Sequence, residues 1–240
     1  MLNVKFLNMK KIVLVTGATS GIGEACARVF ARGGYDVIVT GRRAERLEAL
    51  RKELETLGAA VKTLQFDVRD AEAAKNALAS LEDRWKQVDV LVNNAGLALG
   101  LEKEYEGCPD DWNTMIDTNI KGLLTMTRLV VPGMVERGMG HVINIGSVAG
   151  DAAYAGGNVY CATKAAVKAL TDGLRIDLAD TPVRVTNIKP GLVETEFSRV
   201  RFHGDEDRAS NVYKGYLFMS LDYARMKTIA VVMTRTAWGG

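Results

Sequence analysis

Residues 11–23 read KIVLVTGATSGIG, and this stretch decides the fold class. Its first six residues form a short apolar run rich in β-branched side chains, typical of a parallel strand buried on both faces. A glycine-rich turn follows, and a helical pattern of apolar residues begins at Ala25. Such a turn lets the backbone approach a pyrophosphate, and the helix N-terminus offers free N–H groups. The stretch predicts a nucleotide site contacted by Gly17, Thr19, Ser20, Gly21, Ile22 and Gly23.

The kind of nucleotide is indicated by residues 39–43, VTGRR, which end the next strand-like run. An acidic residue there would bind the ribose hydroxyl of NAD, whereas Arg42 and Arg43 can grip the extra phosphate of NADP. The pair also opens a helix, where positive charge opposes the dipole and calls for an anionic partner. NADP is therefore predicted. The glycine spacing GxxxGxG differs from the common GxGxxG, so an ordinary glycine-rich turn is the alternative.

Strand-like and helix-like segments alternate along the rest of the chain. Strands are predicted at 36–40, 61–66, 88–92, 141–145 and 183–188, and helices at 44–57, 70–86, 111–136 and 158–179. Alternation of this kind predicts an α/β fold, a doubly wound parallel sheet with helices on both faces. With no internal repeat or linker, one domain over residues 1–240 is expected, with 1–8 as a leader and 209–240 as an atypical tail.

The composition excludes several classes of protein. Hydrophobic residues make up 48%, charged residues 25%, and the net charge is +2, so neither disorder nor nucleic-acid binding is indicated. Three cysteines without CxxC spacing predict reduced thiols in the cytoplasm. No apolar stretch reaches the length of a membrane span, and no HExxH or cysteine cluster predicts a metal.

Two further loops follow predicted strands on the same side of the sheet, where ligands of open α/β sheets bind. Asp67 and Val68 follow the third strand, and the carboxylate can accept from an adenine amine. Asn94, Ala95 and Gly96 follow the fourth, with small side chains where a ribose would pack. Each loop alone is also an ordinary polar turn.

A tyrosine and a lysine at YxxxK spacing predict the chemistry. Tyr160 and Lys164 lie one turn apart on one helix face, and a lysine ammonium favours the phenolate, lowering a tyrosine pKa from about 10. Ser147, arriving from a separate strand, can hold the substrate oxygen beside Tyr160. The arrangement suits moving a proton while a hydride moves elsewhere.

These motifs together resemble the short-chain dehydrogenase/reductase family over about residues 9–208. TGATSGIG, NNAG, DTNIKG, Ser147, YCATK and Pro190-Gly191 occur in the family's order and spacing. The resemblance implies a Rossmann-like fold, hydride transfer with a nicotinamide cofactor, and often a homotetramer. It also implies that Tyr160 is the general acid/base, that Ser147 orients the substrate, and that Lys164 binds the nicotinamide ribose. Asn119 then holds a water of the proton relay, while Pro190, Gly191, Val193 and Thr195 line the nicotinamide side.

Substrate identity is indicated by a narrower likeness. NNAGLALG, VPGMVERG, YAGGNVY and GLVETEFSRVRF resemble the bacterial NADP-dependent 3-hydroxy acid dehydrogenases, which act on serine and allo-threonine. Either Arg199 or Arg201 can close over a substrate carboxylate, and the alternative is that these loop arginines are solvated or interfacial. The alternatives are a 3-oxoacyl-thioester or other carbonyl reductase, and a catalytically impaired NADP-binding protein.

Overall fold

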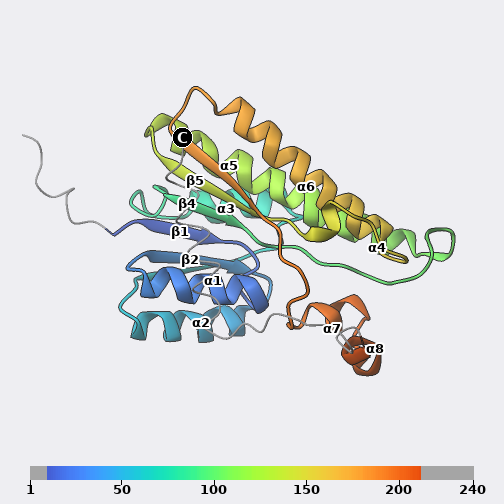
Figure 1. Ribbon diagram of the computed structural model, residues 1–240. Helices are drawn as coiled ribbons and strands as arrows, with labels where there is room; N and C mark the ends of the chain where they lie inside the picture. Colours follow the sequence, from blue (N-terminus) through green and yellow to red (C-terminus); the bar gives the residue numbers. More distant parts are fainter. Residues whose placement is uncertain (1–9, 212–240) are drawn as a thin grey trace, which may run out of the picture.

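The computed structural model describes residues 10–211, and its centre is one sheet of six parallel strands in the order β3-β2-β1-β4-β5-β6 (Figure 1). The predicted doubly wound sheet is confirmed, because the strand order reverses direction between β1 and β4. The strands are β1 (Ile12–Val15), β2 (Asp36–Gly41), β3 (Val61–Gln65), β4 (Val90–Asn93), β5 (Gly140–Ile145) and β6 (Val183–Ile188).

Side-chain alternation along β1 builds a core on each face of the sheet. Ile12 and Leu14 join the cluster under α3 (Ala71–Ala79), α5 (Leu123–Glu136) and α6 (Asn158–Asp177). Val13 and Val15 join the opposite cluster, under α1 (Gly21–Arg32) and α2 (Ala44–Thr56). Because both faces are buried, the strand reads as a continuous apolar run rather than an alternating one.

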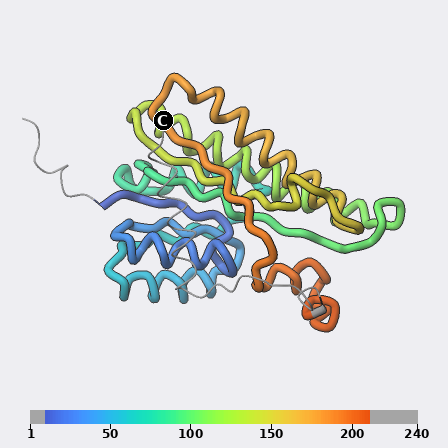
Figure 2. The backbone as a smooth tube through the Cα atoms, in the orientation of Figure 1, coloured from blue at the N-terminus to red at the C-terminus, as the bar shows by residue number. Residues whose placement is uncertain are grey.

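The remaining helices lie at the carboxyl ends of the strands. They are α4 (Pro109–Ile116), α7 (Phe197–Arg201) and α8 (Glu206–Asn211), with short 3₁₀ turns η2 (Glu104–Glu106) and η4 (Val148–Gly150). The chain leaves β6 and crosses to α7 and α8, which lie beyond the ends of the strands (Figure 2). Over residues 10–211, no helix has the length and apolar character needed to span a bilayer.

Two predicted helices differ from the observed ones. The helix predicted at 70–86 ends at Ala79, because the chain then turns to bury Leu81 and Trp85 and to pair Arg84 with the buried carboxylate of Asp36. The helix predicted at 111–136 is divided into α4 and α5 by a π-helical turn, η3 (Asp117–Gly122). The expected leader, and all but residues 209–211 of the expected tail, lie outside the described residues.

A line of buried polar side chains crosses the core between β4, β5 and α6. Asn93 and Asn144 are register partners in the two strands, and the Asn93 Nδ2 donates to Asn144 Oδ1 at 2.9 Å. The Asn144 Nδ2 donates in turn to Thr171 Oγ1 at 2.9 Å, and Thr171 donates to the carbonyl of Val167 at 2.6 Å. Each bond satisfies groups that would otherwise be buried without a partner.

Candidate active site and nucleotide site

The turn between β1 and α1 is shaped so tightly that its glycines cannot carry side chains. Gly17 has φ +63°, and a Cβ there would lie 2.9 Å from the Ala95 Cα. A Cβ on Gly23 would lie 2.5 Å from the Gly17 carbonyl oxygen. Ser20 is the N-cap of α1 but makes no side-chain cap bond, so its hydroxyl leaves the first N–H groups of the helix uncapped. The turn fits a bound pyrophosphate, as the sequence predicts.

Three arginines surround the end of β2 beside this turn. Arg43 donates to Thr19 Oγ1 at 2.9 Å and to Ser20 Oγ at 2.9 Å, so it lies against the glycine turn. Arg42 instead is exposed and lies 3.7 Å from the carboxylate of Asp67. Arg46, in the first turn of α2, also reaches this place. It could not be predicted from the sequence, because its position resembles an ordinary helix surface. The cluster fits the 2′-phosphate of NADP.

The loop after β3 is held by its own ion pair. Asp67 accepts from the Arg69 guanidinium at 2.7 Å and from the Arg69 backbone N–H at 3.0 Å. Burial raises the pKa of Asp67, but the bonds from Arg69 outweigh it, and the net pKa lies below its usual value. Val68 is buried, and its side chain lies where a Cβ on Gly122 would be.

The loop after β4 lies between the glycine turn and the side chains of Asn119 and Lys164. Asn94 Nδ2 donates to the carbonyls of Thr16 at 2.8 Å and Gly17 at 3.1 Å, so it braces the glycine turn. A Cβ on Gly96 would lie 3.2 Å from Asn119 Oδ1 and 3.4 Å from Lys164 Nζ. The small residues of this loop therefore leave space next to Asn119 and Lys164.

Tyr160 and Lys164 are both buried on α6. Burial lowers the pKa of Lys164 to about 8, and its Nζ donates to the Ile145 carbonyl at 2.8 Å. Burial raises the pKa of Tyr160 to about 12, against the lowering effect of a hydrogen bond with Ser147 and of the charge of Arg201. The sequence predicts that Lys164 lowers this pKa, yet its Nζ is 5.9 Å from the Tyr160 ring centroid, and burial of the phenol outweighs the lowering effects.

Asn119 lies in the π-helical turn and is buried. Its Oδ1 accepts from the Leu97 N–H at 2.9 Å, and its Nδ2 donates to the Leu97 carbonyl at 2.8 Å and to Thr163 Oγ1 at 3.0 Å. The side chain thus fastens the loop after β4 to α6. A π-helical turn inside an α-helix is frequent at functional sites.

The segment after β6 covers the other side of the nucleotide turn. The Pro190 carbonyl accepts from the Val148 N–H at 3.2 Å, next to Ser147. Thr195 lies 3.3 Å from where a Cβ on Gly21 would be. The segment therefore runs from the neighbourhood of Ser147 to the start of α1, with Gly191 exposed and Val193 half-buried between them.

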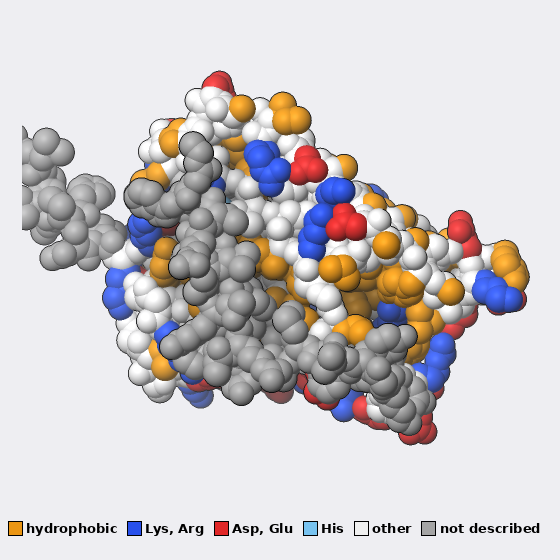
Figure 3. Space-filling model, viewed as in Figure 1, with side chains coloured by type: hydrophobic (Ala, Val, Ile, Leu, Met, Phe, Trp, Pro, Cys, Tyr) orange, Lys and Arg blue, Asp and Glu red, His pale blue; other side chains and the backbone are white. Residues whose placement is uncertain are grey.

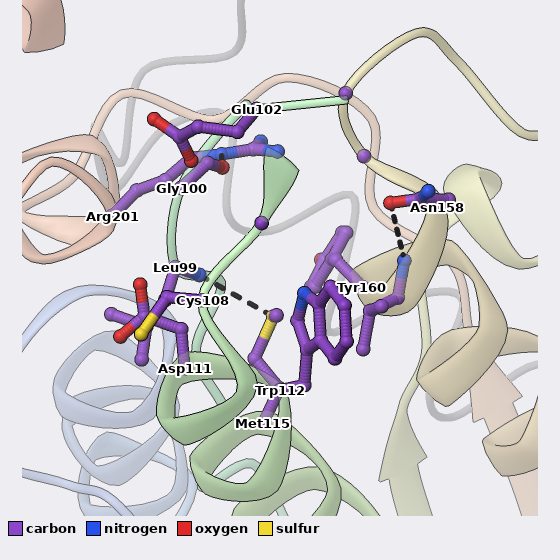
Figure 4. Close-up of a pocket in the computed structure, with 14 residues that line it drawn as sticks. Leu99, Gly100, Glu102, Cys108, Asp111, Trp112, Met115, Asn158, Tyr160 and Arg201 are labelled. Atoms are coloured by element: carbon purple, nitrogen blue, oxygen red, sulfur yellow. Dashed lines mark hydrogen bonds between the residues drawn. The ribbon is translucent and has the colours of Figure 1, made fainter. Parts of the chain in front are cut away.

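A small pocket opens beside Tyr160, lined by Leu99, Trp112, Met115 and Arg201 among others (Figure 4). Apolar side chains also gather in a hollow between the α4–α6 side and the α7–α8 side (Figure 3). The Arg201 guanidinium carbon lies 5.9 Å from the Tyr160 ring centroid, and Arg201 is only 6% exposed. The structure thus brings Arg201, but not the exposed Arg199 paired with Glu206, to the site.

Arg201 donates only to neutral acceptors within residues 10–211. Its Nε donates to the Gly100 carbonyl at 2.9 Å and its Nη1 to the Tyr154 hydroxyl at 2.8 Å. The nearby carboxylate of Glu102 is bound instead to the Leu101 N–H at 2.9 Å and to Arg208 at 3.3 Å. Buried charges in proteins are normally paired, and within residues 10–211 this guanidinium has no carboxylate partner.

Comparisons with known proteins agree with this geometry. The family model described as short chain dehydrogenase matches residues 11–206. The NADP-dependent 3-hydroxy acid dehydrogenase YdfG of Salmonella typhi is 59% identical over 204 residues, which are 85% of this chain and 81% of that protein. Serine 3-dehydrogenase of Rhizobium radiobacter is 51% identical over 207 residues, covering 86% and 82%. The closed form of serine dehydrogenase complexed with NADP+ has a TM-score of 0.86 at 53% identity, covering 92% of this chain and 88% of that chain.

Proposed function

The chain belongs to the short-chain dehydrogenase family, and we propose that it oxidises a small 3-hydroxy acid with NADP. The observation that supports an acidic substrate is the buried guanidinium of Arg201 beside Tyr160. In the described part of the chain it has no carboxylate partner. Relatives more than half identical are named NADP-dependent 3-hydroxy acid dehydrogenases, and they support the same substrate class.

The chain is an oxidoreductase that uses NADP. The glycine turn, the uncapped start of α1 and the arginines after β2 are the groups that would hold the dinucleotide. The bound cofactor would supply the acceptor for the hydride that leaves the carbinol carbon of the substrate. The protein supplies orientation and removes the proton.

In our proposed mechanism Tyr160 is the general base for oxidation and the general acid for reduction. The substrate hydroxyl proton passes to the Tyr160 oxygen as the carbonyl forms, and Ser147 donates a hydrogen bond to the reacting oxygen. Burial holds the Tyr160 pKa at about 12 in the free chain, so ionisation needs further positive charge beside it. Lys164 is the nearest lysine for that task, and Asn119 holds the loop that faces both residues.

We assign substrate orientation to Arg201. Its Nε and Nη1 are used by Gly100 and Tyr154, which fix the guanidinium plane and leave its remaining donors for a ligand. A carboxylate bound there lies on the Tyr160 side of the pocket, so a hydroxyl two carbons from the carboxylate carbon can reach the phenol. Exposed Arg199 is not assigned a substrate role.

We further propose a cytoplasmic homo-oligomer. Apolar side chains are exposed on α4, α5 and α6, including Ile116, Leu124, Val135 and Ile176 at 37 to 75% exposure. A second copy of the chain would bury them, and a homotetramer is the assembly to test by sedimentation. The cysteines are free thiols, which suits a reducing compartment.

The test is a turnover assay with purified protein. NADP or NAD is combined with L-serine, L-allo-threonine or 3-hydroxypropionate, and absorbance of the reduced cofactor is followed. NADP-dependent turnover of these acids is expected. If none of these acids is oxidised and a 3-oxoacyl thioester is reduced with NADPH, the reductase alternative is correct and the proposal is wrong. NADP binding without any turnover would leave a catalytically impaired binding protein.

A further inference from the structure

A carboxylate of the chain itself lies on the arginines that are placed for the 2′-phosphate. Glu196 accepts from Arg43 Nη1 at 3.1 Å, and both of its oxygens accept from Arg46 Nη1 at 2.8 Å. Glu196 precedes α7, far from α2 in sequence, and hydrogen bonding to Arg46 holds its pKa below the usual value. The ion triad of Arg43, Arg46 and Glu196 therefore joins the nucleotide site to the segment that forms the pocket wall.

The position of this triad marks it as an anion site rather than an ordinary surface pair. Arg43 is the N-cap residue of α2 and Arg46 lies in its first turn, where the helix dipole disfavours cations without an anionic partner. The same Arg43 contacts Thr19 and Ser20 of the nucleotide turn. Carboxylate and phosphate use the same guanidinium donors, so Glu196 and a 2′-phosphate cannot both use these faces without repulsion.

We propose that Glu196 is an internal competitor of the 2′-phosphate and that Arg46 is a further phosphate-binding residue. This inference rests on the proposed function in taking NADP as the cofactor. A 2′-phosphate displaces Glu196 from both arginines and thereby frees the start of α7, whereas NAD leaves the triad closed. Since α7 carries Phe197, whose ring is 5.6 Å from that of Tyr160, and Arg201, the phosphate also acts on the pocket wall.

Binding titrations test the competition without turnover. We would measure Kd by calorimetry for NADP, NAD, adenosine 2′,5′-bisphosphate and 5′-AMP, because the last two differ only in the 2′-phosphate. Glu196→Gln should lower Kd for the two 2′-phosphorylated ligands about three- to tenfold and change the others less than about twofold. Glu194→Gln, an exposed carboxylate two residues away, is the matched control and should change none of them.

The variant Arg46→Met distinguishes two roles of Arg46, that of binding the 2′-phosphate and that of only pairing with Glu196. The proposal expects Kd for the 2′-phosphorylated ligands to rise about tenfold, with NAD unchanged. If Arg46 only holds Glu196, the variant will instead tighten these ligands as Glu196→Gln does, and its phosphate role is overturned. Equal effects of Glu196→Gln on NADP and NAD, or none on either, overturn the competition.

Hydrogen exchange reports on α7 directly. The Val200 N–H donates to the Glu196 carbonyl at 3.0 Å, so its exchange should quicken when adenosine 2′,5′-bisphosphate binds to the wild type, and not with 5′-AMP. Unchanged exchange with both would refute the coupling to the pocket. A wild-type protein that binds neither NADP nor the bisphosphate would overturn the proposed function itself, whereas tight NADP binding without these differences overturns the inference alone.

Discussion

Replacing Arg201 by methionine removes one buried charge while keeping a long side chain against the rings of Tyr154 and Tyr160, whose centroids lie 5.4 and 5.9 Å from the guanidinium carbon. Two of the five N–H donors are already used by Gly100 and Tyr154, so a substrate carboxylate can take one or two of the others. A hydrogen bond to a charged group contributes about 1.5–3 kcal/mol. The expected loss in kcat/KM for an acid substrate is therefore about 10- to 150-fold.

The assay compares 3-hydroxypropionate with 1,3-propanediol, which carries a hydroxymethyl group in place of the carboxylate. Arg201→Met should reduce kcat/KM for the acid by that factor and for the diol by less than about threefold, because the diol never used the charge. Arg199→Met is the matched control, since that guanidinium is exposed and paired with Glu206 at 2.6 Å, and it should change neither value by more than about twofold.

Equal losses for acid and diol would refute the assignment of the carboxylate to Arg201. Such a result would mean that the arginine only supports the pocket through Gly100 and Tyr154. Thermal unfolding of each variant separates this from a loss of folded protein, and Arg201→Lys, which keeps the charge but not the planar fork, should recover part of the acid activity.

Three further perturbations follow from the same structure. Tyr160→Phe should abolish turnover while leaving the NADP Kd within about threefold, and retained activity in a steady-state assay would remove Tyr160 from its role. Gly23→Ala places a Cβ 2.5 Å from the Gly17 carbonyl oxygen, so calorimetry should show loss of NADP and NAD affinity alike, whereas Gly173→Ala, with open space around its Cβ, should bind both normally. His141 has a pKa lowered to about 4 by burial, so the unfolded chain, with a value near 6.5, binds more protons between these limits. The free energy of unfolding should then be fully retained above pH 6.5 and fall by up to roughly 3 kcal/mol toward pH 4, and urea titrations of His141→Gln should show a flatter dependence; an unchanged slope would contradict this.

The parallel sheet could be predicted because its signals are local. Each central strand is a short apolar run buried on both faces, and the loops that follow β1, β2 and β4 carry glycine, arginine and asparagine at one sheet edge. The spacing of Tyr160 and Lys164 likewise requires only a helix. The position of the ligand site in the fold then follows from the rule that ligands bind outside the carboxyl ends of parallel strands.

The end of α3 could not be predicted because no local residue stops the helix. The sequence after Ala79 contains neither glycine nor proline before residue 88, and Leu81 and Trp85 continue the helical spacing. The chain nevertheless turns, because the carboxylate of Asp36 is buried at 2% exposure and needs a cation, which Arg84 supplies. Asp36 also accepts a hydrogen bond from the Ala60 N–H at 2.8 Å. A distant buried carboxylate thus overrides helix propensity.

Some features of the site could not be predicted because they depend on contacts between residues distant in sequence. Arg201 and Arg199 are two residues apart with similar neighbours, yet only Arg201 is buried, because Gly100, about one hundred positions away, accepts from it. Arg46 is indistinguishable from other helix-surface arginines until Glu196 is seen opposite it. Asn119 reads as a helical residue, and its bonds to the Leu97 backbone accompany the π-helical turn.

The buried amide chain from Asn93 to Thr171 has a consequence for how the sheet assembles. Parallel strands of valine and isoleucine can slide by two residues and still present the same faces to the two cores. Here such a slip between β4 and β5 would separate the paired amides of Asn93 and Asn144 and leave buried donors without acceptors, at a cost of about 1–3 kcal/mol for each. The amide hydrogen bonds therefore favour the observed register of β4 and β5 over a two-residue slip. A sheet with β4 and β5 out of register by two residues is therefore less stable than the observed one.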